Sequence, residues 1–202
     1  GRRLPKDILG PIKNKPIQLS DGTILSPSST ETRTTEGLNW KAHIEKSSDD
    51  GKTWTKIPID PQTKFDVIQP SLLVLGDGRL QILCRSRDNS VMQAFSQDYG
   101  ETWSQISRTA LPNPNSGTDA ITLSNGLHLL VYNPTVKGKN GRSKLSVALS
   151  KTGENWQEVL SLENEKKGEF SYPAVIESSD GKIHISYTHN RRNIKHVVLE
   201  FN

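Results

Sequence analysis

Four segments of the chain share one pattern of hydrophobic and polar positions. In each, a short apolar stretch runs into Asp-Gly or Asn-Gly, and a second apolar stretch follows. Asn-Gly or Asp-Gly between β-rich stretches is the strongest short-range signal for a β-hairpin, because a type I′ turn needs positive φ at its central residues. The pattern predicts four hairpins, at QLSDGTIL (18–25), VLGDGRLQIL (74–83), TLSNGLHLLV (122–131) and ESSDGKIHIS (177–186).

A second pattern recurs between the hairpins. SSDDGKTW (47–54) and SQDYGETW (96–103) both fit Ser-x-Asp-x-Gly-x-Thr-Trp, and SKTGENW (150–156) is a shortened copy without the Asp. Each unit of roughly 50 residues therefore contains two hairpins, or four strands, and four-stranded units repeated around an axis form propeller blades. The predicted fold class is all-β, a β-propeller of four-stranded blades.

Composition narrows the class of protein further. Only 32% of the residues are apolar and 6% aromatic, which is little for one large core and fits several small blade interfaces. A net charge of +4 gives no strong electrostatic case for nucleic acid, and no apolar run approaches the roughly 18–20 residues that span a bilayer. Cys84 is alone, so no disulfide or Cys-based metal site can form within the chain. We expect no metal, no cofactor, no nucleic-acid partner and no membrane span.

The repeated Ser-x-Asp-x-Gly-x-Thr-Trp segment resembles the Asp-box, or bacterial neuraminidase repeat, of the sialidase-like propellers. Its side chains suit a structural role: Ser and Asp accept backbone N–H bonds within a tight turn, Gly takes the left-handed conformation, and Trp packs a flat apolar surface. We therefore interpret Asp49, Asp98, Trp54 and Trp103 as scaffold and not as a sugar site.

The chain is expected to form a single propeller domain over residues 1–202. Its blades are predicted at about 12–59, 67–107, 118–161 and 171–201. The last unit offers only three strands, and the resemblance to sialidases implies a ring of six blades. Because the missing strand and blades would come from an N-terminal segment, we interpret the chain as the C-terminal part of a longer, six-bladed propeller. The first residue, Gly1, and the sole methionine, Met92, also indicate a processed product or an excerpt. A closed ring of four blades is the alternative.

The resemblance also implies a set of site residues. Sialidases hold the carboxylate of an acidic sugar with three arginines, and a tyrosine, activated by a glutamate, attacks the anomeric carbon. In this chain LGDGRLQILCR places Arg85, and NGRSKLSVALS places Arg142, at two of the arginine positions, and SYPAVIESSDG places Tyr172 at the tyrosine. The guanidinium fork suits a carboxylate, and nearby arginines favour the ionised phenol.

The glutamate position departs from the family pattern. The segment DVIQPSLLVLGDG offers Gln69 there, and an amide cannot take a proton. A tyrosine with an ordinary pKa of about 10 is a poor nucleophile without a carboxylate partner. Glu31 or Glu169 are candidates to replace it. The first arginine and the acid/base aspartate of the family have no counterpart in this chain.

Three further residues are candidate substrate contacts: His43, His189 beside Arg191 and Arg192, and Lys15. Lys15 lies with Lys13 and Asn14 in PIKNKP, at the start of an inner strand, where a solvated loop is equally expected. Asn113, Asn115 and Asp119, in the turn-rich segment 112–120, either contact sugar hydroxyls or cap turns.

The resulting hypothesis is a sialidase-like exo-glycosidase that acts, in its complete form, on a terminal acidic sugar, with an acidic glycan as the partner. Two alternatives stay open. One is a lyase that eliminates across a uronic-acid linkage. It is motivated by Gln69 and by His43 and His189: a histidine at the mouth, with Tyr172, would suit proton abstraction, while the arginines and the amide neutralise the carboxylate. The other is a non-catalytic carbohydrate-binding propeller, since a fold does not dictate function.

Overall fold

A computed structural model describes residues 1–35, 37–138 and 140–200 of the chain, and these residues form strands and no helix. The predicted all-β class is confirmed. The strands are β1 (Ile17–Gln18), β2 (Ile24–Thr34), β3 (Gly37–Ser47), β4 (Thr55–Pro58), β5 (Val67–Val74), β6 (Leu80–Ser86), β7 (Ser90–Ser96), β8 (Ser107–Pro112), β9 (Asp119–Thr122), β10 (His128–Tyr132), β11 (Lys144–Ser150), β12 (Gln157–Asn164), β13 (Phe170–Glu177), β14 (Ile183–His189) and β15 (Asn193–Leu199).

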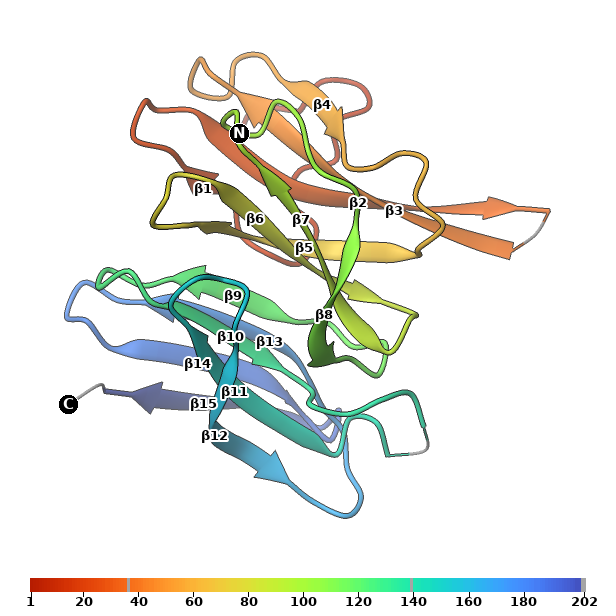
Figure 1. The fold of residues 1–202 in the computed structure, drawn as a ribbon, viewed down its shortest axis with the longest axis vertical. Helices are drawn as coiled ribbons and strands as arrows, with labels where there is room; N and C mark the ends of the chain where they lie inside the picture. Colours follow the sequence, from red (N-terminus) through yellow and green to blue (C-terminus); the bar gives the residue numbers. More distant parts are fainter. Residues whose placement is uncertain (36, 139, 201–202) are drawn as a thin grey trace.

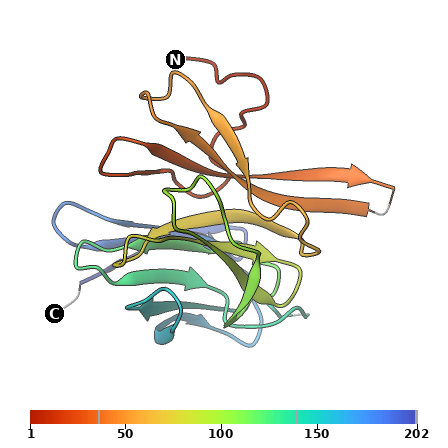
Figure 2. The ribbon, with the colours of Figure 1, turned by 45° about the horizontal axis from the view of Figure 1, so that its top comes forward.

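The strands form four antiparallel sheets in sequence order, which we call blades 1 to 4. Blades 1, 2 and 3 are β1-β2-β3-β4, β5-β6-β7-β8 and β9-β10-β11-β12, and blade 4 is the three-stranded β13-β14-β15. Consecutive blades lie side by side, from the red and orange blade 1 to the blue blade 4 (Figures 1 and 2). The first strands of blades 2, 3 and 4 contact one another in order, β5 with β9 and β9 with β13. These strands therefore surround the axis of the propeller.

The apolar residues form one cluster at each blade interface, as the low apolar content predicts. Strand alternation explains how one blade serves two interfaces, because successive side chains point to opposite faces. On β10, Leu129 and Val131 pack toward blade 4, and Leu130 and Tyr132 pack toward blade 2.

The four hairpins form where the sequence predicts them, but with a different turn. The glycines have φ between 79° and 88°, and the Asp or Asn before each of them does not have positive φ. In the first hairpin the amide of Gly22 donates to the carbonyl of Leu19, and the amide of Leu19 donates to the carbonyl of Thr23. This is a three-residue loop that ends in a left-handed glycine, so only one position needs positive φ. The aspartate accepts a hydrogen bond from the amide of Thr23 at 2.9 Å instead.

The Asp-box segments form tight turns between the third and fourth strands. Asp98 accepts hydrogen bonds from the hydroxyl of Ser96 and from the amide of Thr102. The indole of Trp103 donates to the carbonyl of Gly100 at 3.2 Å. Asp49 and Trp54 make the same contacts in blade 1.

The face of blade 4 that points away from blade 3 is uncovered. Ile176 and Val198 on this face are 51% and 45% exposed. Within the described residues the four blades therefore form an open arc. No helix in this part of the chain has the length and hydropathy to cross a bilayer.

Candidate functional site

At the start of each inner strand, or up to four residues before it, one residue lies near the axis. Counting back nine residues from the hairpin glycines 22, 78, 126 and 181 gives Lys13, Gln69, Gly117 and Tyr172. We call these the mouth positions. The three that are not glycine all have positive φ, at 69°, 56° and 52° respectively. The sheet register also shifts next to Gln69 and to Tyr172, as in a β-bulge. Left-handed backbone is unfavourable for such side chains and occurs often at functional sites.

Arg85 lies on β6, behind two of these positions. Its side chain is largely buried, with the residue 9% exposed. Its Nη1 lies 3.4 Å from the hydroxyl of Tyr172 and 3.5 Å from Oε1 of Gln69. Its Nε donates to Oδ1 of Asn115 at 2.8 Å. All three partners are neutral, and Arg85 makes no ion pair with any described residue.

Arg142 approaches the same tyrosine from blade 3. Its guanidinium carbon lies 5.4 Å from the ring centroid of Tyr172, and that of Arg85 lies 6.0 Å away. Nη2 of Arg142 donates to the carbonyl of Asn115 at 3.0 Å, so Asn115 holds both arginines. The structure thus brings together Arg85, Arg142 and Tyr172, which lie far apart in the sequence.

The electrostatics of this cluster act on the phenol. Burial opposes ionisation of Tyr172, but the hydrogen bond from Arg85 and the charges of Arg85 and Arg142 outweigh it, and the pKa of Tyr172 falls below its ordinary value. The residue is 42% exposed, so the ring remains open to a ligand.

The carboxylates considered for the glutamate role bind residues other than Tyr172. Glu169 pairs with Nη1 of Arg142 at 3.0 Å and with Nε of Arg191 at 2.6 Å. Burial of Glu169 raises its pKa, but the two arginines lower it by a larger amount, so the pKa lies below its ordinary value. Glu31 accepts a hydrogen bond from the indole of Trp40 at 2.9 Å. Neither carboxylate is a hydrogen-bond partner of Tyr172, and Gln69 reaches Arg85 with its amide oxygen.

His43 and His189 lie outside the cluster. His43 is 2% exposed, and its Nε2 lies 3.3 Å from Oε1 of Glu45, which also accepts hydrogen bonds from the amides of Leu9 and Gly10. Burial lowers the pKa of His43. The ring of His189 packs against Phe170 at 5.1 Å. Glu45, with His43 beside it, therefore secures the N-terminal segment to blade 1.

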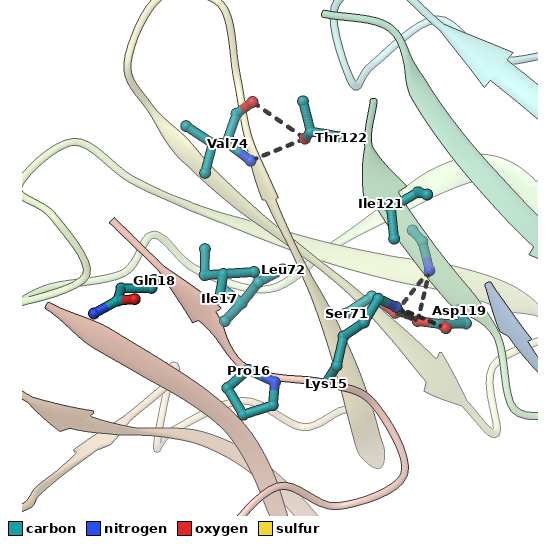
Figure 3. Close-up of a pocket in the computed structure, with 11 residues that line it drawn as sticks. Lys15, Pro16, Ile17, Gln18, Ser71, Leu72, Val74, Asp119, Ile121 and Thr122 are labelled. Carbon is teal, nitrogen blue, oxygen red and sulfur yellow. Dashed lines mark hydrogen bonds and ion pairs between the residues drawn. The ribbon is translucent and has the colours of Figure 1, made fainter. Parts of the chain in front are cut away.

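Lys15 lies two residues after Lys13 and just before β1, where its side chain points to Asp119 of β9 (Figure 3). Its Nζ pairs with Asp119 at 2.8 Å. Asp119 also accepts hydrogen bonds from the hydroxyl of Ser71 and the amide of Val175. One carboxylate thereby joins residues of all four blades. Beside it, inner strands of blades 1, 2 and 3 line a cavity of about 260 Å³.

Sequence reasoning considered Asn115 and Lys13 only as sugar contacts or loop residues, and did not predict their contacts with other blades. The spacing from the hairpin glycine identifies Lys13, because it is the same in all four blades. Asn115 has no such signal, since its role depends on two arginines that the fold brings to it.

The family of BNR repeat-like domains matches residues 1–185. The anhydrosialidase of Macrobdella decora is 24% identical over 204 residues, which cover 89% of this chain and 25% of that protein. The chain therefore spans about a quarter of the length of this curated relative.

Solved structures show the same fold at low sequence identity. The NanB sialidase of Streptococcus pneumoniae superimposes with a TM-score of 0.70 at 20% identity, over 93% of this chain and 30% of that one. A protein of unknown function from Dyadobacter fermentans gives 0.76 at 17%, over 94% and 53%. The intramolecular trans-sialidase of Ruminococcus gnavus gives 0.68 at 19%, over 92% and 43%. Because the family match covers most of the chain, the protein belongs to the BNR repeat-like domain family, with a sialidase-like β-propeller fold.

Proposed function

We propose that the site at Arg85, Arg142 and Tyr172 binds the carboxylate of a terminal acidic sugar, and that the complete protein acts on this sugar as an exo-glycosidase. The observation that carries the proposal is the convergence of two guanidinium groups on one half-exposed tyrosine. The charge of the site itself favours an anionic ligand.

Arg85 is a mostly buried cation whose partners are all neutral. A buried charge without an opposite charge is costly, and a bound carboxylate would compensate for it. Arg142 adds a second fork, although it shares its charge with Glu169. Two arginines can hold one carboxylate with several charge-assisted hydrogen bonds.

The ligands of two related proteins are consistent with this choice. The Ruminococcus gnavus trans-sialidase is in complex with oseltamivir carboxylate, and a leech intramolecular trans-sialidase is in complex with 2,7-anhydro-Neu5Ac. In the proposed reaction the phenolic proton of Tyr172 passes to solvent, because Gln69 cannot accept it and the two arginines lower the pKa of the phenol. The phenolate oxygen bonds to the anomeric carbon as the glycosidic carbon–oxygen bond breaks, and the departing alcohol takes up a proton from water. Water then hydrolyses the bond between Tyr172 and the sugar and restores the phenol.

The binding half of the proposal is tested by calorimetry with N-acetylneuraminic acid and its methyl ester. We expect the ester to bind at least about tenfold more weakly than the acid, because it lacks the charge that the arginines hold. Arg79→Ala is the matched control, since Arg79 pairs with Asp77 and Glu154 away from the mouth. Equal affinity for acid and ester would refute the proposal.

The catalytic half is tested with the complete protein and 3′-sialyllactose. Tyr172→Phe should retain binding and lose release of the sugar, because only the nucleophilic oxygen is removed. Saturable binding without release by the unaltered protein would instead identify a non-catalytic binding propeller.

One observation favours elimination as a second candidate. The amide of Gln69 stands beside Arg85, and no carboxylate is a hydrogen-bond partner of Tyr172 among the described residues. In that reaction Tyr172 removes the proton next to a uronic-acid carboxylate, which the arginines and the amide neutralise, and the leaving group departs from the β-carbon. The product would contain a new carbon–carbon double bond that absorbs ultraviolet light. A hydrolase yields no such absorbance.

A further inference from the structure

Lys13 reaches from blade 1 across the axis to blades 3 and 4. Its Nζ donates to the carbonyls of Thr118 and Pro173 at 2.7 and 2.8 Å, and to Oδ1 of Asn14 at 2.9 Å. Thr118 and Pro173 each directly follow a mouth position. One ammonium group therefore fixes the backbone next to two mouth positions.

The neighbouring side chain makes the corresponding contact with blade 2. Asn14 is 3% exposed, and its Nδ2 donates to the carbonyl of Gln69 and to the hydroxyl of Ser71, both at 2.9 Å. Lys13 and Asn14 together thus bind the backbone at or beside the mouth positions of blades 2, 3 and 4. We call this pair the axial clamp.

The glycine at the mouth position of blade 3 makes room for the clamp. A Cβ atom on Gly117 would lie 2.7 Å from Cε of Lys13 and 3.2 Å from Oε1 of Gln69. Its φ is not in the left-handed region, unlike that of the other three mouth positions. Close approach of the lysine, and not backbone conformation, is therefore what requires glycine here.

The clamp acts where the backbone is least favourable. Gln69 and Tyr172 have φ of 56° and 52°, and such residues keep that conformation only when the surrounding structure holds them. The clamp bonds are made to the carbonyl of Gln69 itself and to that of Pro173, directly after Tyr172.

We propose that Lys13 and Asn14 are positioning residues that hold Gln69 and Tyr172 in the left-handed conformation and so place the Tyr172 hydroxyl against Arg85. Neither residue needs to touch the sugar. The consequence for sugar binding rests on the proposed function, whereas the consequence for the backbone does not.

The direct test measures φ of Gln69 and Tyr172 by three-bond NMR couplings at neutral pH. We expect positive φ in the unaltered chain and its loss or averaging at both residues in Lys13→Met. Tyr99, with φ of 56° in the second Asp-box, is an internal control that should not change. Lys41→Met is the matched control variant, because it also removes a lysine that donates to a backbone carbonyl, that of Thr63, which is not next to a mouth position. Unchanged φ at Gln69 and Tyr172 in a folded Lys13→Met would overturn the proposal.

Gly117→Ala is a second route to the same result if Lys13→Met does not fold. The added methyl group displaces the Lys13 side chain while the lysine itself remains, and we expect the same loss of positive φ at Tyr172. Retention of the couplings in Gly117→Ala would also count against the clamp.

Sugar affinity provides a separate readout. We expect Lys13→Met to bind N-acetylneuraminic acid about tenfold more weakly than the unaltered chain, since misplacing a charge-assisted contact costs an amount of this order. If the unaltered chain fails to bind the acid, the proposed function fails, and the NMR couplings still decide whether the clamp exists.

Discussion

The Asp-box turns and the mouth positions both recur from blade to blade, but they recur in different ways. In blades 1 and 2 the boxes repeat the same side chains and the same hydrogen bonds, from Asp49 to Thr53 and from Asp98 to Thr102. The mouth positions repeat a place in the fold and change the side chain, from lysine to glutamine, glycine and tyrosine.

The difference separates what holds a blade together from what the blades do jointly. Every Asp-box closes its own turn, so the same solution serves each blade. At the axis the blades meet, and each contributes a different group to one shared site. A residue that repeats in sequence is therefore expected to affect stability, and one that varies at a repeated place is expected to affect the ligand.

The sharpest test of the mouth is Arg85→Ala. We expect affinity for an acidic sugar to fall about a hundredfold, because charge-assisted hydrogen bonds to the carboxylate are lost. Calorimetry with N-acetylneuraminic acid measures this. The melting temperature should change little, since the variant also removes a buried cation that has no ionic partner. Unchanged affinity would leave the cluster without its assigned ligand.

The corresponding test of the Asp-box is Asp98→Ala. We expect the melting temperature to fall by about 2–6 °C, as on loss of a capping side chain, with sugar affinity unchanged. Scanning calorimetry and a binding titration give the two readouts. Hydrogen bonds from Thr102 and Ser96 lower the pKa of Asp98 to about 2. The stability that the box contributes is therefore present above the ordinary carboxyl range and should disappear as the pH falls toward that value.

The axial clamp should also make stability depend on pH, but in the alkaline range and through a buried base instead of a surface acid. Burial lowers the pKa of Lys13 to about 8, against the attraction of Asp119. Above about pH 8 the folded chain gives up this proton before the unfolded chain does, so stability rises with pH up to the ordinary lysine pKa. We expect the free energy of unfolding, relative to Lys13→Met, to rise by about 1–3 kcal/mol across this window. Urea titrations at several pH values test it, and a flat difference would contradict it.

The smallest effect is expected in the degenerate box of blade 3. There the hydroxyl of Thr152 replaces the carboxylate and accepts long hydrogen bonds from the amides of Glu154 and Asn155, at 3.3 and 3.4 Å. Trp156 still donates to the carbonyl of Gly153. Thr152→Asp should raise the melting temperature by about 1–2 °C, because an ionised acceptor binds amides more strongly. A decrease would show that the shortened turn excludes a carboxylate.

Much of the fold could be predicted because its signals are local. Asp-Gly and Asn-Gly located all four hairpins, although the observed turns place only the glycine at positive φ. Family spacing singled out Arg85, Arg142 and Tyr172, which the structure brings together. The same reasoning considered Glu169 as a partner of Tyr172, whereas two arginines bind that carboxylate.

The sequence by itself determined the four hairpins and the scaffold role of the Asp-boxes, because turn chemistry depends on residues close together in the chain. It located the blades only approximately: the second was predicted to end at residue 107, where β8 (Ser107–Pro112) begins. Only the tertiary structure decided what surrounds Tyr172. Arg85 lies 87 residues before Tyr172 in the chain. Pro173, next to Tyr172, accepts a hydrogen bond at its carbonyl from Lys13, which lies 160 residues before it. Such contacts follow from how successive blades pack around the axis, which no local pattern specifies.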